Sequence, residues 1–263
     1  MAKFFTIASG SSGNSSFIGA SGEGILIDFG VSCRSVTSAL KSKGIDPCSL
    51  AGILITHEHI DHVRGLAVFL KSHHIPVFAS APVLSFLVSN NLVPKDSVLN
   101  EIDEHGQIIG GMMIKPFHTS HDSVGSLGYS VTTADEQRIS ICTDTGYITD
   151  DAREHLMGST VVLIESNYDN GMLEFGPYPY HLKRRIKGPA GHLSNTDCAA
   201  FLPELIKNGT THIVLGHLSK ENNTPEVALQ TCISELSIAG MKKDKDYVIF
   251  AAPRSEASEN ILL

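Results

Sequence analysis

A short stretch of the chain concentrates side chains that bind metal ions. Thr56-His57-Glu58-His59-Ile60-Asp61-His62 places three imidazoles and a carboxylate within six positions, directly after an apolar run. Alternate residues of extended backbone point the same way, so His57 and His59 can face one ion, while Asp61 and His62 at the turn face a neighbouring one. Neutral imidazole and carboxylate suit zinc, manganese or iron. A solvated histidine-rich loop is the alternative interpretation, and it does not account for this density.

The motif His-x-His-x-Asp-His after a hydrophobic strand resembles the signature of the metallo-β-lactamase superfamily. The resemblance implies an α/β (α+β) fold, a four-layer αββα sandwich in which two mixed β-sheets are flanked by helices, with the metals at one edge. It also implies that two cations lower the pKa of a bridging water and polarise the electrophile that the resulting hydroxide attacks. The implied reaction is a hydrolysis, with Asp61 both a ligand and a catalytic residue.

The same resemblance assigns further ligands at the ends of later predicted strands. In Phe117-His118-Thr119-Ser120-His121-Asp122 the matching position is His121, with His118 as its rival. Asp144 matches the carboxylate that bridges both ions and His217 matches the final histidine, a solvated turn residue being the alternative at each position. The implied set is His57, His59 and His121 on one divalent ion and Asp61, His62 and His217 on the other, with Asp144 shared.

Two carboxylates at strand ends are candidates for support rather than coordination. Asp28 follows the apolar run Ile25-Leu26-Ile27 and matches a superfamily aspartate that holds the ligand loop by hydrogen bonding. Glu165 ends another apolar run and can make a similar hydrogen bond. We expect both side chains to orient ligands.

A fourth histidine motif bears on the substrate. Gly191-His192-Leu193-Ser194-Asn195 begins a predicted helix, which Ser194 or Asn195 can cap. In the RNase Z-like phosphodiesterase branch, a histidine at this place assists phosphate binding and protonates the leaving oxygen, so the resemblance implies that catalytic role for His192. Lys183 and Arg184 lie in the densest positive cluster and suit a phosphate backbone, although a solvated helix face explains each equally well.

The motifs together are similar to those of the YycJ/WalJ-type bacterial metallo-hydrolases, over nearly the whole chain. This resemblance implies a phosphodiesterase or nuclease, with DNA exonuclease activity as its narrower form. A small-molecule hydrolase acting on a cyclic phosphodiester or a thioester, and a non-catalytic metal-stabilised regulatory protein, are the alternatives. The motifs are residues 8–15, 57–62, 143–146, 165–169, 191–195 and 215–219, with Asn222 and Asn223.

The order of apolar runs and turn residues predicts strand–helix alternation, then consecutive strands, then alternation again. The predicted strands are Lys3–Ile7, Ser16–Ile18, Ile25–Asp28, Gly52–Thr56, Val77–Ala79, Gln107–Ile109, Met112–Phe117, Leu127–Thr133, Arg138–Cys142, Thr160–Glu165, His212–Gly216 and Tyr247–Ala251. The predicted helices are Ser35–Lys43, His62–Ser72, Pro179–Lys187, Asn195–Lys207 and Pro225–Ala239, with others after Pro82 and Asp150. Since no linker interrupts this order, we expect one domain over residues 1–263.

The net charge and the lengths of the apolar runs limit the partners that the protein can bind. A net charge of −8 over 263 residues argues against unspecific adhesion to nucleic acid, which Lys and Arg drive, but bound divalent cations reverse the potential within a pocket. Apolar runs fall short of the roughly 18 residues that a membrane span needs, the N-terminal residues lack a leader pattern, and the five cysteines are scattered. We expect a cytoplasmic protein with a phosphodiester substrate, DNA among the candidates, and no membrane partner.

Overall fold

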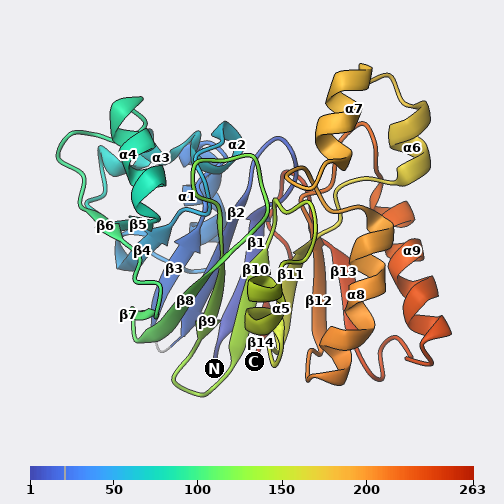
Figure 1. Cartoon of the computed structure of the whole chain (residues 1–263). Coiled ribbons are helices and arrows are strands. Elements are labelled where there is room, and N and C mark those ends of the chain that lie inside the picture. Colours follow the sequence, from blue (N-terminus) through green and yellow to red (C-terminus); the bar gives the residue numbers. More distant parts are fainter. Residues whose placement is uncertain (21) are drawn as a thin grey trace. The chain divides into compact units, whose positions relative to one another are not determined.

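The computed structural model describes residues 1–20 and 22–263, and its strands form two mixed sheets flanked by helices (Figure 1). The chain falls into two compact units. Unit 1 comprises Met1–Pro116, Ser123–Gln137 and Pro253–Leu263, and unit 2 comprises Phe117–Asp122 and Arg138–Ala252. Among the described residues, no helix combines the length and the apolar character that crossing a membrane requires.

The sheet of unit 1 changes from antiparallel to parallel at its middle strand. Its strand order is β14-β1-β2-β3-β4-β5-β6, with antiparallel pairing from β14 to β3 and parallel pairing from β3 to β6. Parallel neighbours end at the same edge, so the residues that follow β3 and β4 lie side by side. The strands are β1 (Lys3–Ala8), β2 (Ser15–Ala20), β3 (Glu23–Ile27), β4 (Leu50–Leu54), β5 (Val77–Ala79), β6 (Leu99–Glu101) and β14 (Ile261–Leu262).

Helices cover this sheet through one apolar stripe each. The helices of unit 1 are α1 (Cys33–Ser42), α2 (Ile60–Val63), α3 (Leu66–Leu70) and α4 (Ala81–Ser89), with a 3-10 turn at Pro47–Ser49. Val36 and Leu40 of α1, Phe69 of α3 and Leu87 of α4 are fully buried in one cluster with Leu26 of β3. Full burial of one such side chain stabilises the fold by about 1.5–3 kcal/mol. The cluster therefore fixes β3 and β4, whose ends carry candidate site residues.

The second sheet contains β7 (Gln107–Ile109), β8 (Met112–His118), β9 (Leu127–Thr132), β10 (Arg138–Cys142), β11 (Val161–Glu165), β12 (His212–Gly216) and β13 (Val248–Ala251). In unit 2, β10 to β13 pair in parallel and in order, whereas β7 pairs antiparallel with the part of β8 that belongs to unit 1. The helices of unit 2 are α5 (Asp150–Leu156), α6 (Asn170–Phe175), α7 (Tyr180–Lys187), α8 (Asn195–Lys207) and α9 (Pro225–Ile238). Leu156, Leu202 and Leu236, one from each of α5, α8 and α9, are fully buried against Val162 and Ile213.

The structure differs from the predicted helices and strands at several places. The predicted helix His62–Ser72 is wrong: two short helices, α2 and α3, replace it, because the backbone turns at Gly65, whose N–H donates to Phe29 O at 3.0 Å. The elements β6, α6 and β14 were not predicted. Two of them are strands of two or three residues, too short to show a periodic pattern, and α6 is glycine-containing and six residues long.

Candidate metal centre

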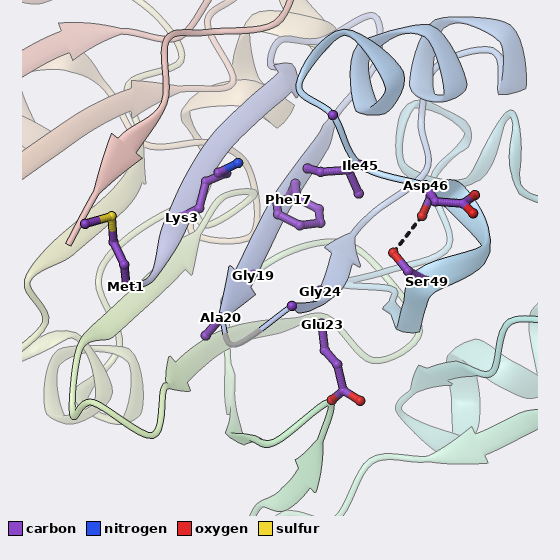
Figure 2. Close-up of a pocket in the computed structure, with 12 residues that line it drawn as sticks. Met1, Lys3, Phe17, Gly19, Ala20, Glu23, Gly24, Ile45, Asp46 and Ser49 are labelled. Carbon is purple, nitrogen blue, oxygen red and sulfur yellow. Dashed lines mark hydrogen bonds between the residues drawn. The ribbon is translucent and has the colours of Figure 1, made fainter.

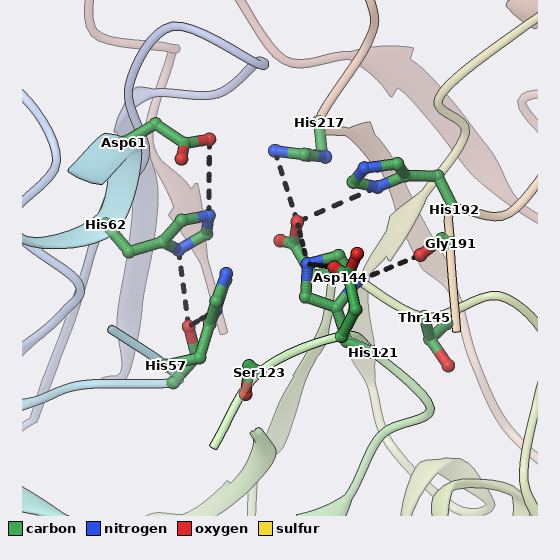
Figure 3. Close-up of polar contacts among 12 residues, drawn as sticks. His57, Asp61, His62, His121, Ser123, Asp144, Thr145, Gly191, His192 and His217 are labelled. Atoms are coloured by element: carbon green, nitrogen blue, oxygen red, sulfur yellow. Dashed lines mark hydrogen bonds and ion pairs between the residues drawn. The ribbon is translucent and has the colours of Figure 1, made fainter. Parts of the chain in front are cut away.

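Unit 1 holds four of the predicted metal ligands, in the loop after β4 and in α2. The ring centroids of His57 and His59 lie 4.6 Å apart, and those of His57 and His62 lie 4.1 Å apart. Asp61 Oδ2 lies 3.6 Å from His62 Nε2 (Figure 3). His57 and His62 are fully buried, whereas the side chain of Asp61 is 19% exposed. The structure therefore brings these four predicted ligands into one cluster.

The Asp28 carboxylate contacts the Nδ1 side of the His62 ring. Its Oδ2 lies 2.7 Å from His62 Nδ1, and the same carboxylate accepts hydrogen bonds from the Thr56 N–H at 2.8 Å and the Thr56 hydroxyl at 2.9 Å. Because Nδ1 of His62 is engaged in this way, the ring presents Nε2 toward Asp61. These contacts are the kind of support expected of Asp28 from its position after β3.

The glycine-serine loop before β2 supports Asp61. Gly13 N–H donates to Gly10 O at 3.0 Å and closes a tight turn, which places Asn14 beside the ligand loop. Asn14 N–H donates to Asp61 O at 2.8 Å, and Asn14 Nδ2 lies 3.1 Å from His62 Nε2. The loop therefore fixes the backbone that carries the Asp61 carboxylate.

Unit 2 contributes a second group, arranged around Asp144. Its Oδ1 lies 3.4 Å from His217 Nε2, 3.7 Å from His121 Nε2 and 3.7 Å from His192 Nδ1 (Figure 3). Asp144, Glu165, His192 and His217 each offer one ligand atom, and these four atoms lie within 4.8 Å of one another. The parallel pairing of β10, β11 and β12 explains this convergence, because the residues that end these strands emerge at one edge.

Glu165, the last residue of β11, orients two histidines at once. Its Oε1 lies 2.8 Å from His192 Nδ1 and 2.8 Å from His217 Nδ1, while Oε2 accepts the N–H groups of Thr145 at 2.9 Å and Leu193 at 3.2 Å. Complete burial alone would raise the pKa of Glu165, but the charge of His192 and the hydrogen bonds from both histidines outweigh it and lower this pKa. The buried carboxylate therefore stays ionised and fixes both rings.

His121 and its rival His118 occupy different surroundings. His121 Nδ1 lies 2.9 Å from Gly191 O, which leaves Nε2 facing Asp144. Burial lowers the pKa of His121 in spite of the opposing Asp144 charge, and the neutral ring is the form that binds metals. The His118 side chain is 76% exposed, with Nδ1 3.1 Å from Asp151 Oδ2. His121 alone of the two lies beside Asp144.

The backbone at three strand ends takes the left-handed conformation. Asp28 has a φ of 63°, Asp144 of 56° and His217 of 54°. Such a conformation costs a residue with a side chain on the order of 1–3 kcal/mol, and it persists where surrounding contacts impose it. Here it turns each side chain sharply out of the strand direction, toward the hydrogen-bonding partners just described.

The predicted substrate-binding residues differ in how far they are buried and hydrogen-bonded within the protein. Ser194 caps α8 by accepting the Asp197 N–H at 3.0 Å, and Asn195 is buried, accepting from the Ser166 hydroxyl at 2.6 Å. On α7, Lys183 Nζ donates to Glu174 O at 2.7 Å. Arg184 is exposed, with its guanidinium carbon 6.0 Å from the centroid of the Tyr180 ring.

Several supporting residues had no assigned role in the sequence analysis. Thr56 and Asn14 contact the unit 1 histidines, and Asn167 Nδ2 donates to His217 O at 2.7 Å. Asn223 Nδ2 donates to Asn167 O at 3.1 Å. The available signal was their place in polar motifs next to apolar strands, but the motifs alone do not show which atoms meet.

Two cavities elsewhere in unit 1 are lined by residues other than the predicted site residues. One cavity, of about 490 Å³, is lined by the Phe17 ring and by the charged residues Lys3 and Asp46. Figure 2 shows these residues. Another, of about 560 Å³, lies beside α1 and includes Arg34 and Arg254. Neither cavity contains any of the predicted metal ligands.

The donor set fits divalent metal ions. Nδ1 of His62, His121 and His217 faces a carboxylate or carbonyl oxygen, and Nε2 of each ring is directed toward the carboxylate of Asp61 or Asp144. Histidines that bind metals are commonly held in this way, with the second nitrogen bonded to the protein. Buried carboxylates and imidazoles in both units therefore have the chemistry of divalent-metal ligands.

Sequence comparison decides the family. Residues 24–217 match the model of the Beta-lactamase superfamily domain. The chain belongs to the metallo-β-lactamase superfamily. Within this superfamily, the protein named Exodeoxyribonuclease WalJ from Streptococcus pneumoniae is 36% identical over 251 residues, which cover 94% of this chain and 93% of that protein. The protein named Exodeoxyribonuclease YycJ from Bacillus anthracis is 33% identical over 228 residues, which cover 86% and 85%.

The fold comparison agrees with the sequence comparison. The metallo-beta-lactamase fold protein YhfI from Bacillus subtilis is similar with a TM-score of 0.73 at 14% identity, covering 98% of each chain. At that identity the likeness concerns the fold. The predicted superfamily and its fold, with two mixed sheets flanked by helices, are confirmed.

Proposed function

We propose that this protein is a metal-dependent exodeoxyribonuclease, which hydrolyses phosphodiester bonds at the ends of DNA. The observation that carries this proposal is the 36% identity to Exodeoxyribonuclease WalJ over 94% of this chain. The polar geometry of unit 2 supports it, because His192, the proposed proton donor, has its Nδ1 3.7 Å from Asp144 Oδ1, a predicted metal ligand. The five free cysteines agree with a reducing compartment, so we place the enzyme in the cytoplasm.

The superfamily resemblance and the donor groups of the two units support a pair of divalent ions as cofactors. Zinc, manganese or iron would each accept such ligands. Bound ions of this kind activate water and neutralise charge on the phosphate. The proposed ligands are His57, His59, Asp61 and His62 from unit 1 and His121, Asp144 and His217 from unit 2.

The protein residues divide the remaining work. Asp28 and Glu165 keep ligand rings in their tautomer and orientation, through the hydrogen bonds to His62 Nδ1 and His217 Nδ1. The 2.8 Å contact between Glu165 Oε1 and His192 Nδ1 directs His192 Nε2 away from Glu165. We assign Nε2 the proton that passes to the leaving oxygen as the phosphorus–oxygen bond breaks, a transfer for which imidazole is suited near neutral pH.

Hydrolysis of end-labelled DNA tests the proposal. Purified protein, stripped with chelator and then supplied with Mn²⁺ or Zn²⁺, is incubated with single-stranded DNA, double-stranded DNA, RNA and bis(p-nitrophenyl) phosphate. We expect loss of terminal nucleotides from DNA. His192→Ala should lower kcat by about 10²–10⁴-fold, the usual contribution of a general acid. Asp61→Ala should abolish turnover and weaken metal binding, while His118→Ala should leave both close to wild type.

Other outcomes assign the site differently. Cleavage of the small diester without cleavage of any nucleic acid would contradict the nuclease proposal and favour a small-molecule hydrolase. Hydrolysis of a thioester, tested in parallel, would favour that class. Complete inactivity of metal-loaded protein toward every substrate would favour the non-catalytic alternative.

A further inference from the structure

The segment between β11 and α8 carries exposed aromatic rings that its own core does not need. Residues 169–188, the α6–α7 segment, pack around a small cluster in which Tyr168, Leu173 and Ile186 are buried. Phe175, at the end of α6, is 91% exposed, and Tyr180, at the start of α7, is 75% exposed. Leaving two large rings in water is a feature of binding surfaces, where an aromatic side chain supplies contact area with few rotatable bonds.

The charge of the α6–α7 segment is opposite to that of the whole chain. It contains four Lys or Arg residues against two acidic residues, in a protein whose net charge is −8. Lys187 pairs with Glu174, and Arg185 pairs with Asp122 at 2.5 and 2.8 Å. Among the described residues no carboxylate forms an ion pair with Arg184, and its guanidinium lies 6.0 Å from the Tyr180 centroid. A cation and an aromatic ring are therefore presented together, one helical turn apart on α7.

The same segment is fastened to the residues around Asp144. His192 N–H donates to Ile186 O at 2.9 Å, so the end of α7 holds the backbone of the proposed proton donor. Asp122, which receives Arg185, is the neighbour of His121, and Asp122 N–H donates to Ala190 O at 3.0 Å. At the other end, Asp169 N–H donates to Asn222 O at 2.9 Å. The exposed rings thus stand on a scaffold anchored to the proposed site.

Two exposed rings, one of them beside a cation that no described carboxylate pairs, match the chemistry of single-stranded nucleic acid. Aromatic side chains stack on bases regardless of sequence, and basic side chains meet the backbone phosphates. A protein partner would be bound through a larger apolar face, whereas the helix surface around Tyr180 is occupied by Arg184 and His181. We propose that the α6–α7 segment grips unpaired nucleotides of the DNA substrate, with Phe175 and Tyr180 stacking on bases and Arg184 contacting a phosphate. This inference rests on the proposed nuclease function.

Binding and cleavage are measured separately, so that the two proposals can fail independently. Fluorescence anisotropy of a labelled single-stranded oligonucleotide with chelator-treated protein measures the binding affinity in the absence of hydrolysis. Because stacking contributes about 1–3 kcal/mol per base, the Phe175→Ala/Tyr180→Ala double variant should weaken binding by at least about tenfold. Arg184→Gln should lower the slope of log K against log salt by about 0.7. Ile238→Ala, at a position 82% exposed on α9, and Lys207→Gln on α8 are the matched controls and should change neither quantity.

Kinetics of metal-loaded protein complete the test. The double variant should raise KM for single-stranded DNA while kcat/KM for bis(p-nitrophenyl) phosphate stays at the wild-type value, since the small diester has no neighbouring bases for the rings to stack on. Equal losses on both substrates would overturn the inference and indicate general damage to the site. Unchanged DNA binding, or a shift in molar mass by light scattering that marks the rings as a self-association surface, would also overturn it. Failure of the wild type to cut DNA would count against the nuclease function, while the binding data would still decide the role of the rings.

Discussion

At the scale of single residues, the hydrogen bonds that buried acids make to the proposed ligands decide how the histidines are oriented. A metal-binding loop that contained only its histidines would leave each ring free to rotate and to change tautomer. Here Asp28 and Glu165 occupy Nδ1 of His62 and His217, and the carboxylates themselves are satisfied by backbone N–H groups. Ring orientation is therefore set by buried acids several residues or strands away from the ligand.

Glu165→Gln tests this dependence. The amide nitrogen would face N–H donors in place of an acceptor oxygen, which disturbs His192 and His217 together. Loss of an outer partner of metal ligands commonly costs 10–100-fold in metal affinity or activity, and we expect a decrease of about this size in both. Metal titration and DNA hydrolysis are the measurements. Glu154→Gln, an exposed change on α5, is the control, and a Glu165→Gln enzyme with unaltered metal affinity would contradict the assignment.

At the scale of elements, close backbone approach between segments positions Asp61. A Cβ on Gly30 would lie 1.6 Å from Asp61 O, a backbone atom already engaged by the Asn14 N–H at 2.8 Å. The segment after β3 and the ligand loop after β4 therefore pack with no room for a side chain. Gly30 offers no side-chain atom to a metal ion. It belongs to the unit 1 site because of this close approach to Asp61.

Gly30→Ala should displace the ligand loop. Because a backbone atom cannot swing aside as a side chain does, we expect the free energy of unfolding to fall by at least about 2 kcal/mol, together with weaker metal binding. Gly44→Ala is the comparison, since its Cβ would meet nothing within 4 Å although its φ is 73°. Gly44→Ala should lower the free energy of unfolding by only about 1–2 kcal/mol and leave metal affinity unchanged. Equal effects of the two substitutions, measured by urea unfolding and metal titration, would show that packing against Asp61 is unimportant.

Strand β9 is linked to the end of β4 by a buried tyrosine, whose titration gives a second test. Tyr129 donates its hydroxyl proton to Ile55 O at 2.7 Å, and burial, with the Asp28 charge, raises its pKa well above 10. A raised folded pKa means that the stabilisation is complete below the unfolded value, about 10, and is lost as pH rises toward the folded value.

The unfolding curves of wild type and Tyr129→Phe should therefore converge in alkali. Near neutral pH the variant should be less stable by about 1 kcal/mol, the usual net value of one hydrogen bond. Above pH ~10 the wild type should lose up to about 1.4 kcal/mol per pH unit that the variant does not lose. Urea unfolding between pH 7 and 11 measures the difference, and a gap that stays constant over this range would refute the argument.

At the scale of the whole molecule, buried ionisable groups make stability depend on bound metal. Both units bury carboxylates and imidazoles among few cations, in a chain whose net charge is −8. A ligand that binds only the folded state stabilises it by about 2.7 kcal/mol at a free concentration 100 times its Kd. The free energy of unfolding should therefore depend on how much metal is bound.

Metal removal should lower the melting temperature and repletion should restore it. We expect elemental analysis to find two divalent ions per chain in the loaded protein, with His57→Ala and His217→Ala each reducing that content. Differential scanning fluorimetry before and after chelator, and after Mn²⁺ or Zn²⁺, measures the thermal shift. Identical melting with and without metal would rule out the coupling, and a content of one ion would contradict the prediction that Asp144 is shared by two ions.

The sequence by itself determined the family and the chemistry. The ligand loop at residues 57–62, the polar residues after apolar strands and the order of elements suffice to predict the superfamily, because metal ligands of this type must follow strand ends in a fixed order. The prediction of one helix over residues 62–72 was wrong, and α6, whose end exposes Phe175, was absent from it. Local patterns do not report where a backbone turns to pack against another segment.

Only the tertiary structure decided which residues meet. Glu165 bonds His192 and His217, which are 27 and 52 positions away, and Asp28 bonds His62 across 34 positions. Those contacts depend on which strands are neighbours and in what register, and on left-handed backbone at Asp28, Asp144 and His217. Hydrophobic periodicity indicates that a strand exists and which face is buried, whereas its neighbours are chosen by packing of the whole core. The exact partners of the supporting carboxylates and the exposure of the rings on the α6–α7 segment therefore came from the fold.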